Sequence, residues 1–160
     1  MTHHQPKDEL KEALQLCEIH HERMQYAYHK VKHYFPLNTN TYKKLSEDDL
    51  SYLDQLIFRF SKLQDSMGNR LFPALLESLG EDIRGLPFID LLTTLERLQL
   101  LEDHKQWFRL RETRNTVTHE YPFITDQIIE GLNTLSEDAV TISNILNAFK
   151  TYCRKRFDIQ

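Results

Sequence analysis

The chain has 160 residues, 40% of them hydrophobic, and a formal net charge of -4. This length fits one domain that buries its own core without disulfides or structural metals. The acidic balance argues against a non-specific nucleic-acid coat protein, because such proteins carry a clear positive excess.

Composition and hydrophobic periodicity predict an all-α fold. Only 4 glycines and 5 prolines occur, and apolar residues recur at helical spacing along nearly the whole chain. We therefore expect residues 1–160 to form one domain, an antiparallel bundle of about five helices. The N-terminus lacks a secretory signal, and no apolar run reaches the ~20 residues of a membrane span. We accordingly expect a cytoplasmic protein without membrane contact, in which Cys17 and Cys153 are buried thiols.

The first half of the chain predicts two long helical segments. The first runs from about Lys7 to Phe35, with a seam of two rows of residues spaced by seven: Leu10, Cys17, Met24, Val31 and Leu14, His21, Tyr28, Phe35. Pro36 and the Asn/Thr-rich residues after it predict a loop. A capping box at 46–49 opens the next segment. Because Gly68 and Pro73 interrupt it, we expect a kinked helix or two nearly collinear pieces that end at Gly80.

The second half predicts a short element and two further helices. The short element spans about 88–101, and Asp103 is the expected N-cap of the next helix. That helix should end near His119 to Tyr121, because Pro122 disfavours helical geometry in the residue before it. Thr125 or Asp126 caps the last helix. Its seam has two rows: Ile128, Leu135, Ile142, Phe149 and Leu132, Ala139, Leu146, Cys153.

The most informative segment is 114–121, which reads Arg-Asn-Thr-Val-Thr-His-Glu-Tyr. On a helical wheel Arg114 lies within an apolar stripe that carries Trp107, Leu110, Val117 and Tyr121. Arg114 and His119 are five residues apart and diverge by about 140° on an ideal helix. One helix alone does not easily focus both on one phosphate. A long arginine that reaches round the end of the helix could do so, and so could a symmetric dimer in which two such helices face each other.

The chemistry of these groups suits cleavage of RNA without a metal. Arg114 could neutralise charge on a phosphate under attack. His119 lies near a helix C-terminus, where the dipole favours an imidazolium that can act as general acid or base. Asn115 is four residues before His119 and could orient its ring by a hydrogen bond. Arg111, in the same basic segment, is a candidate supporting residue.

Arg-Asn-x3-His-x-Tyr at the end of a helix in a small all-α chain resembles the HEPN domain, and more narrowly its HepT type. The full pattern is expected only about 0.001 times by chance in this composition. The resemblance implies a homodimeric endoribonuclease toxin of a type VII-like toxin-antitoxin pair, with Arg114 and His119 as the catalytic pair. It also implies a minimal nucleotidyltransferase antitoxin as partner, which attaches AMP to the motif tyrosine, here Tyr121.

Two other interpretations remain open. The chain could be a non-catalytic HEPN-like partner of a minimal nucleotidyltransferase, in which Arg114 and His119 bind phosphate without turnover. Alternatively, Arg114 could be only a structural ion-pair member of a dimeric bundle. No cofactor or metal is expected: His29 and His33 have the spacing of two ligands, but no nearby acid or cysteine completes a zinc site. The remaining carboxylates, Asp54 and Asp65 among them, are interpreted as helix surface and caps.

Overall fold

The computed structural model describes residues 5–121 and 123–159. These residues form helices, turns and loops and contain no β-strand, so the all-α prediction is confirmed for this part of the chain. Every helix within it is too short or too polar to span a membrane.

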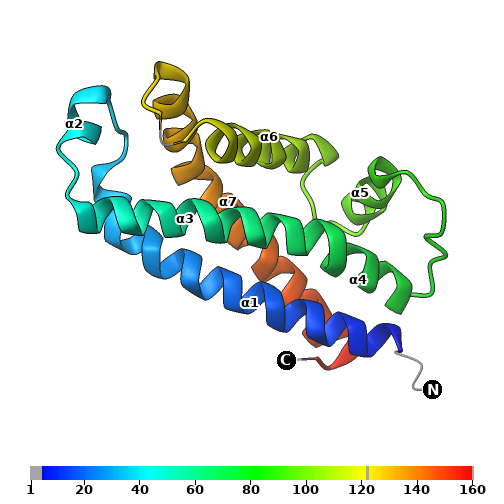
Figure 1. The fold of residues 1–160 in the computed structure, drawn as a ribbon. Helices are drawn as coiled ribbons and strands as arrows, with labels where there is room; N and C mark the ends of the chain where they lie inside the picture. The colour runs from blue at the N-terminus through cyan, green and yellow to red at the C-terminus, as the bar shows by residue number, and fades with distance from the viewer. Residues whose placement is uncertain (1–4, 122, 160) are drawn as a thin grey trace.

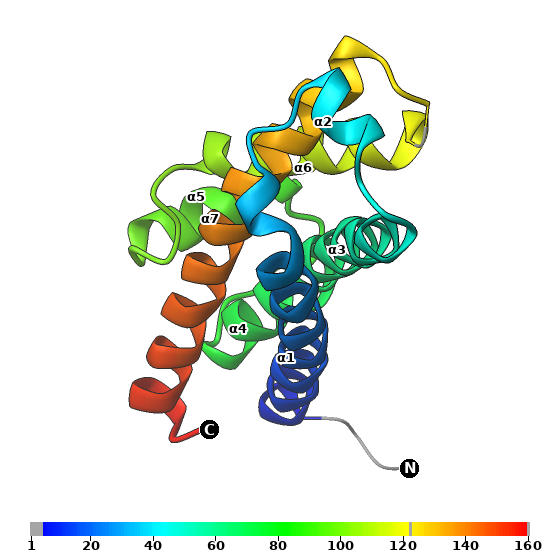
Figure 2. The same cartoon turned by 90° about the vertical axis from the view of Figure 1, so that its left-hand side faces the viewer.

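The helices pack side by side around a common core (Figure 1). In chain order they are α1 (Pro6–Val31), η1 (Lys32–Tyr34), α2 (Thr39–Lys43), α3 (Glu47–Ser66), η2 (Met67–Leu71), α4 (Phe72–Ser78), α5 (Phe88–Arg97), α6 (His104–Glu120) and α7 (Asp126–Phe157). α3 lies between α1 and α6, and α7 crosses behind them to end near the start of α1 (Figures 1 and 2). This arrangement leaves α6 in contact with α3, α5 and α7.

The predicted seams form the core. In α7 both rows are buried, and Ile128, Leu135, Ile142 and Phe149 have no exposed surface. In α1 the row from Leu10 to Val31 is likewise buried. The second α1 row is polar in its middle: the ring of His21 lies 3.0 Å from Ser143 Oγ on α7, and Gln25 Nε2 donates to the same hydroxyl. A small hydrogen-bonded group therefore joins α1 to α7.

Two boundaries in the first half differ from the sequence prediction. α1 ends at Val31 rather than Phe35, and a turn of 3-10 helix follows. The predicted loop after Pro36 contains the short helix α2, which was not predicted from the sequence. Asn38 and Thr41 explain it, because each side chain accepts a hydrogen bond from the backbone N–H of the other. This reciprocal capping box fixes one helical turn inside a polar segment.

The predicted interruption at Gly68 and Pro73 takes the form of a π-helical segment, η2, between α3 and α4. The two α-helices are nearly collinear (Figure 1), as one of the two alternatives expected. The wider turn accommodates Pro73, which has no N–H to donate. A Cβ built on Gly68 would lie 3.5 Å from the ring of Trp107 on α6. A methyl group at this position would therefore be in ordinary contact with α6, and only a larger side chain would press against it.

The element after Pro87 is shorter than expected and ends at Arg97 instead of Leu101. Gln99 adopts a left-handed conformation with φ 62, and the N–H of Leu100 donates to the carbonyl of Leu95 at 3.0 Å. This is the Schellman pattern, in which two apolar residues also meet across the helix end. Leu95 and Leu100 are both buried, so burial of this pair explains the early stop.

Candidate functional site

α6 carries the motif and is fixed by a cap and a buried apolar face. The side chain of Asp103 accepts a hydrogen bond from the N–H of Gln106 at 2.8 Å, which confirms the predicted N-cap. Trp107, Leu110 and Val117 are buried, as the helical wheel predicts. The Trp107 ring packs 4.6 Å from that of Phe72 on α4. The core therefore sets both the rotation and the depth of the motif helix.

Arg114 is half-buried and faces α3. Its Nη2 donates to Asp65 Oδ2 at 2.9 Å, and its Nη1 donates to Asn115 Oδ1 at 3.1 Å. Its Nε is buried without a hydrogen-bond partner in the described part of the chain. The side chains of Arg114 and Asp65 remain 31% and 37% exposed. One edge of the guanidinium is thus held by a carboxylate that is itself open to solvent.

His119 lies in the last turn of α6 and is exposed. Among the described residues no hydrogen bond is formed by its ring, so the expected bond from Asn115 is not made: the Asn115 oxygen binds Arg114 instead. Arg114 faces α3 while His119 faces outward, in keeping with the divergence expected on an ideal helix. A single chain does not bring the two groups of the motif to one point.

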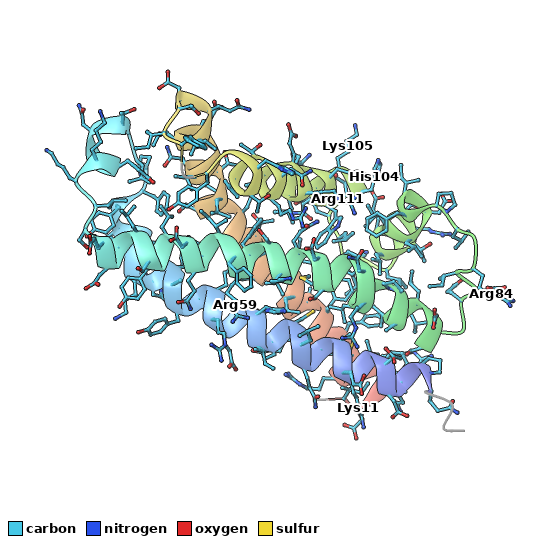
Figure 3. All side chains as sticks on the ribbon, viewed as in Figure 1. Lys11, Arg59, Arg84, His104, Lys105 and Arg111 are labelled. Atoms are coloured by element: carbon cyan, nitrogen blue, oxygen red, sulfur yellow. The ribbon has the colours of Figure 1, made fainter. Side chains whose placement is uncertain are left out.

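Arg111 faces a different neighbour. Its guanidinium carbon lies 4.9 Å from the ring centroid of Phe88 on α5 and 5.9 Å from that of Phe108. Figure 3 labels it together with His104 and Lys105 on α6, where it lies midway between the start of the helix and the last turn that carries His119. Arg111 therefore ties α6 to α5, and no contact in the described structure joins it to Arg114.

Tyr121 leaves the helix, as expected for a residue before proline, with φ -66 and ψ 138. Its hydroxyl donates to Asp54 Oδ1 on α3 at 2.6 Å. Burial, the bond to Asp54 and the neighbouring Tyr42 together raise the pKa of the Tyr121 phenol far above its usual range. The phenol of the motif therefore stays protonated, with its proton held by a carboxylate.

A pocket of about 550 Å³ opens beside this pair, between α3 and α6. Its aromatic walls are Tyr42, Phe58 and Tyr121, and its polar groups include Asp54, Ser61 and Thr118. Because Thr118 lies on the motif helix and Tyr121 directly follows it, this pocket and the Arg114–Asp65 pair lie along one seam between α3 and α6. The two helices run antiparallel there, since residue numbers rise along α3 from Asp54 to Asp65 as they fall along α6 from Tyr121 to Arg114.

Sequence reasoning missed the α3 side of this seam. Asp54 and Asp65 were expected to be surface carboxylates or caps, but each accepts a hydrogen bond from a motif residue. One signal was available: Asp54, Phe58, Ser61 and Asp65 are spaced by four, three and four, which places them on one face of a helix. The cap interpretation holds for Asp49, which caps α3 with Ser46 and accepts the hydroxyl proton of Tyr34.

The two histidines considered as metal ligands lie apart from this seam. His29 is in α1 with its ring 5.8 Å from that of Tyr28, and His33 is in η1 with its ring 4.0 Å from that of Tyr34. Within residues 5–121 and 123–159, no group of three or more potential ligand side chains is placed to hold a metal ion.

Known proteins give no further guide to this site. No family model, no curated protein and no solved structure matches the chain. Its function must therefore be inferred from the groups that line the α3–α6 seam and from the exposed histidine at its end.

Proposed function

We propose that this protein is an endoribonuclease of the toxin kind, in which Arg114 and His119 act on one phosphate across a homodimer. The observation that carries the proposal is the contrast between the two motif residues. Arg114 is fixed in a half-buried position by Asp65 and Asn115, whereas His119 is exposed with no hydrogen-bond partner in the described residues. A preorganised cation beside an accessible imidazole suits charge stabilisation and proton transfer.

A dimer could bring Arg114 and His119, which point in different directions within one chain, to the same phosphate. If the motif ends of two α6 helices face each other, His119 of one copy can approach the phosphate held by Arg114 of the other. Three large apolar side chains near this end of α6 are exposed: Phe58 by 50%, Phe123 by 76% and Ile124 by 41%. Exposed apolar groups of this size are typical of interaction surfaces, which supports a contact here.

The proposed reaction uses the RNA itself as nucleophile. The ribose 2′-oxygen attacks the adjacent phosphorus while a base takes its proton, and the bond from phosphorus to the 5′-oxygen breaks as an acid protonates the leaving oxygen. The two His119 side chains of a dimer supply the base and the acid, and Arg114 stabilises the added negative charge. DNA lacks the 2′-hydroxyl and should not be cut.

The test compares His119→Ala with His29→Ala, which removes another exposed histidine on α1. Cleavage of RNA is followed in the presence of EDTA, with analysis of the 2′,3′-cyclic phosphate ends. We expect His119→Ala to lower the rate by about 10²–10⁴-fold and His29→Ala to leave it unchanged. Wild-type cleavage by His119→Ala, with both variants folded, would remove the proposed catalytic role.

A second candidate is a non-catalytic partner of a minimal nucleotidyltransferase. It is favoured by the ion pair of Arg114 with Asp65, which occupies one edge of the cation that would otherwise act on substrate. In this case the product that can be measured is the chain with AMP attached to Tyr121. Intact-mass spectrometry of the chain expressed with the nucleotidyltransferase should show additions the size of AMP, absent from Tyr121→Phe, while RNA stays intact.

A further inference from the structure

The pocket between α3 and α6 has a size and a lining that fit one flat heterocycle. Its volume of about 550 Å³ lies within the range of small-ligand sites. Tyr42, Phe58 and Tyr121 provide aromatic surface, and Leu50 and Ile57 add apolar contacts. Single-stranded nucleic acids place unstacked bases on such aromatic surfaces.

The hydrogen bonds within the pocket determine what a ligand must offer. Ser61 Oγ donates to the carbonyl of Ile57 at 2.8 Å, and Thr118 Oγ1 donates to that of Arg114 at 2.7 Å. The Tyr121 hydroxyl donates to Asp54. The protons of these three hydroxyls are therefore already used, and the fourth hydroxyl of the lining, that of Tyr42, lies beside that of Tyr121.

The main groups in the pocket that can still bind a ligand are the carboxylate oxygens of Asp54, which accept hydrogen bonds. A carboxylate has about four lone-pair sites on two oxygens, and the Tyr121 hydroxyl occupies one of them. Asp54 is exposed, so the other sites are accessible from the pocket. A complementary ligand thus presents two adjacent N–H donors on a planar edge.

Among the nucleobases, guanine has that edge, with N1–H beside the N2 amino group. Adenine and cytosine place a ring acceptor next to their amino group, and uracil places its N–H between two carbonyls. We propose that this pocket is a guanine-binding subsite, in which Asp54 accepts from N1–H and N2–H and the base lies against Phe58 and Tyr42.

The surroundings favour a nucleotide over the other planar donor, an arginine side chain of a partner protein. Lys62 Nζ lies 5.6 Å from the centroid of the ring of Phe58, which lines the pocket. This cation attracts a phosphate and repels a guanidinium. Arg114 lies one helical turn from Thr118, about 6 Å along the helix axis, so a base in the pocket places its phosphate near the motif. This last step rests on the proposed function, whereas the binding of guanine does not.

The test is an NMR titration of the ¹⁵N-labelled full chain with GMP, AMP, UMP and CMP in turn. We expect GMP to bind at least about tenfold more tightly than the other three, with shift changes at Asp54, Thr118 and Tyr121. Asp54→Asn should abolish the preference for GMP, and Phe58→Ala should weaken all four alike. Asp48→Asn, at an exposed carboxylate in the first turn of α3, is the matched control and should bind like the wild type.

Equal affinity for all four nucleotides, or unchanged GMP binding by a folded Asp54→Asn, would overturn the proposal. Tighter binding of an arginine-containing peptide than of GMP would also overturn it and assign the pocket to a protein partner. An assay of RNA cleavage by the wild type separates this inference from the proposed nuclease. GMP preference without RNA cleavage by the wild type keeps the subsite and rejects the nuclease, and cleavage without GMP preference rejects the subsite alone.

Discussion

Arg114 and Asp65, 49 residues apart in the sequence, form a 2.9 Å ion pair that spans the seam between α6 and α3. The carboxylate fixes one edge of the guanidinium, and Asn115 holds the adjoining nitrogen. Since both charged side chains keep about a third of their surface exposed, water screens the pair. Its main effect should be on the orientation of Arg114 and much less on the stability of the fold.

A double-mutant cycle measures this directly. We expect the coupling between Arg114→Ala and Asp65→Ala to be about 0.5–1 kcal/mol in urea denaturation, because the pair is partly solvated. Arg114→Ala should nonetheless lower RNA cleavage by about 10²–10³-fold. The Asp82–Arg84 pair is a control of the same chemistry with side chains 66% and 90% exposed, and its cycle should show no coupling. A coupling above about 3 kcal/mol would mark Arg114 as a structural ion-pair member.

Substitutions at Gly68 probe the contact between η2 and Trp107 on α6. Gly68→Ala should stabilise the protein by about 0.5–1 kcal/mol, because the new Cβ meets Trp107 and Phe88 at 3.5–3.6 Å, ordinary contact distances, and alanine favours helix. Gly68→Leu should destabilise it by about 1–3 kcal/mol, because the larger side chain cannot fit against the buried Trp107. Thermal unfolding followed by circular dichroism checks both. Equal stability of the two variants would mean that α6 does not rest on this glycine.

Acidification should destabilise the protein through His21. Burial, only partly offset by Glu18, lowers the pKa of His21, so the folded state favours the neutral ring that bonds to Ser143 and Gln25. The contribution of neutral His21 to the free energy of unfolding is therefore complete above the ordinary histidine pKa of about 6.5. It is lost as the pH falls through the lower pKa of His21 in the folded state.

The measurement is the difference in unfolding free energy between pH 7.5 and pH 5 for the wild type, His21→Asn and His29→Asn. His21→Asn should show a smaller loss than the wild type. His29→Asn, at an exposed position of the same helix, should behave like the wild type. The same loss in all three would place the acid sensitivity in other groups.

The two cysteines should be unreactive in the native protein. Cys17 and Cys153 are fully buried, and burial raises the pKa of Cys17 to about 12 and that of Cys153 to about 11. Since the thiolate is the reactive form, a disulfide reagent at pH 8 should label neither within minutes but both in guanidinium chloride. Rapid native labelling of one thiol would show that α1 or the end of α7 opens locally.

The sequence by itself determined most of the helical framework. Rows of apolar residues spaced by seven located the buried faces of α1 and α7, because a helix that packs along its whole length must repeat its apolar side at that period. Local chemistry located the helix starts at Ser46 and Asp103 and gave Thr125 or Asp126 for a third, of which Thr125 is the cap, since a capping side chain bonds to backbone only three residues away.

The tertiary structure decided the features that depend on contacts distant in sequence. The partners of Arg114 and Tyr121 lie 49 and 67 residues earlier, and no local pattern specifies which face of α3 meets α6. The early end of α5 depends likewise on the burial of Leu95 together with Leu100. The motif could be read in the sequence, but the pocket beside it exists only because packing brings Asp54 and Phe58 against the end of α6.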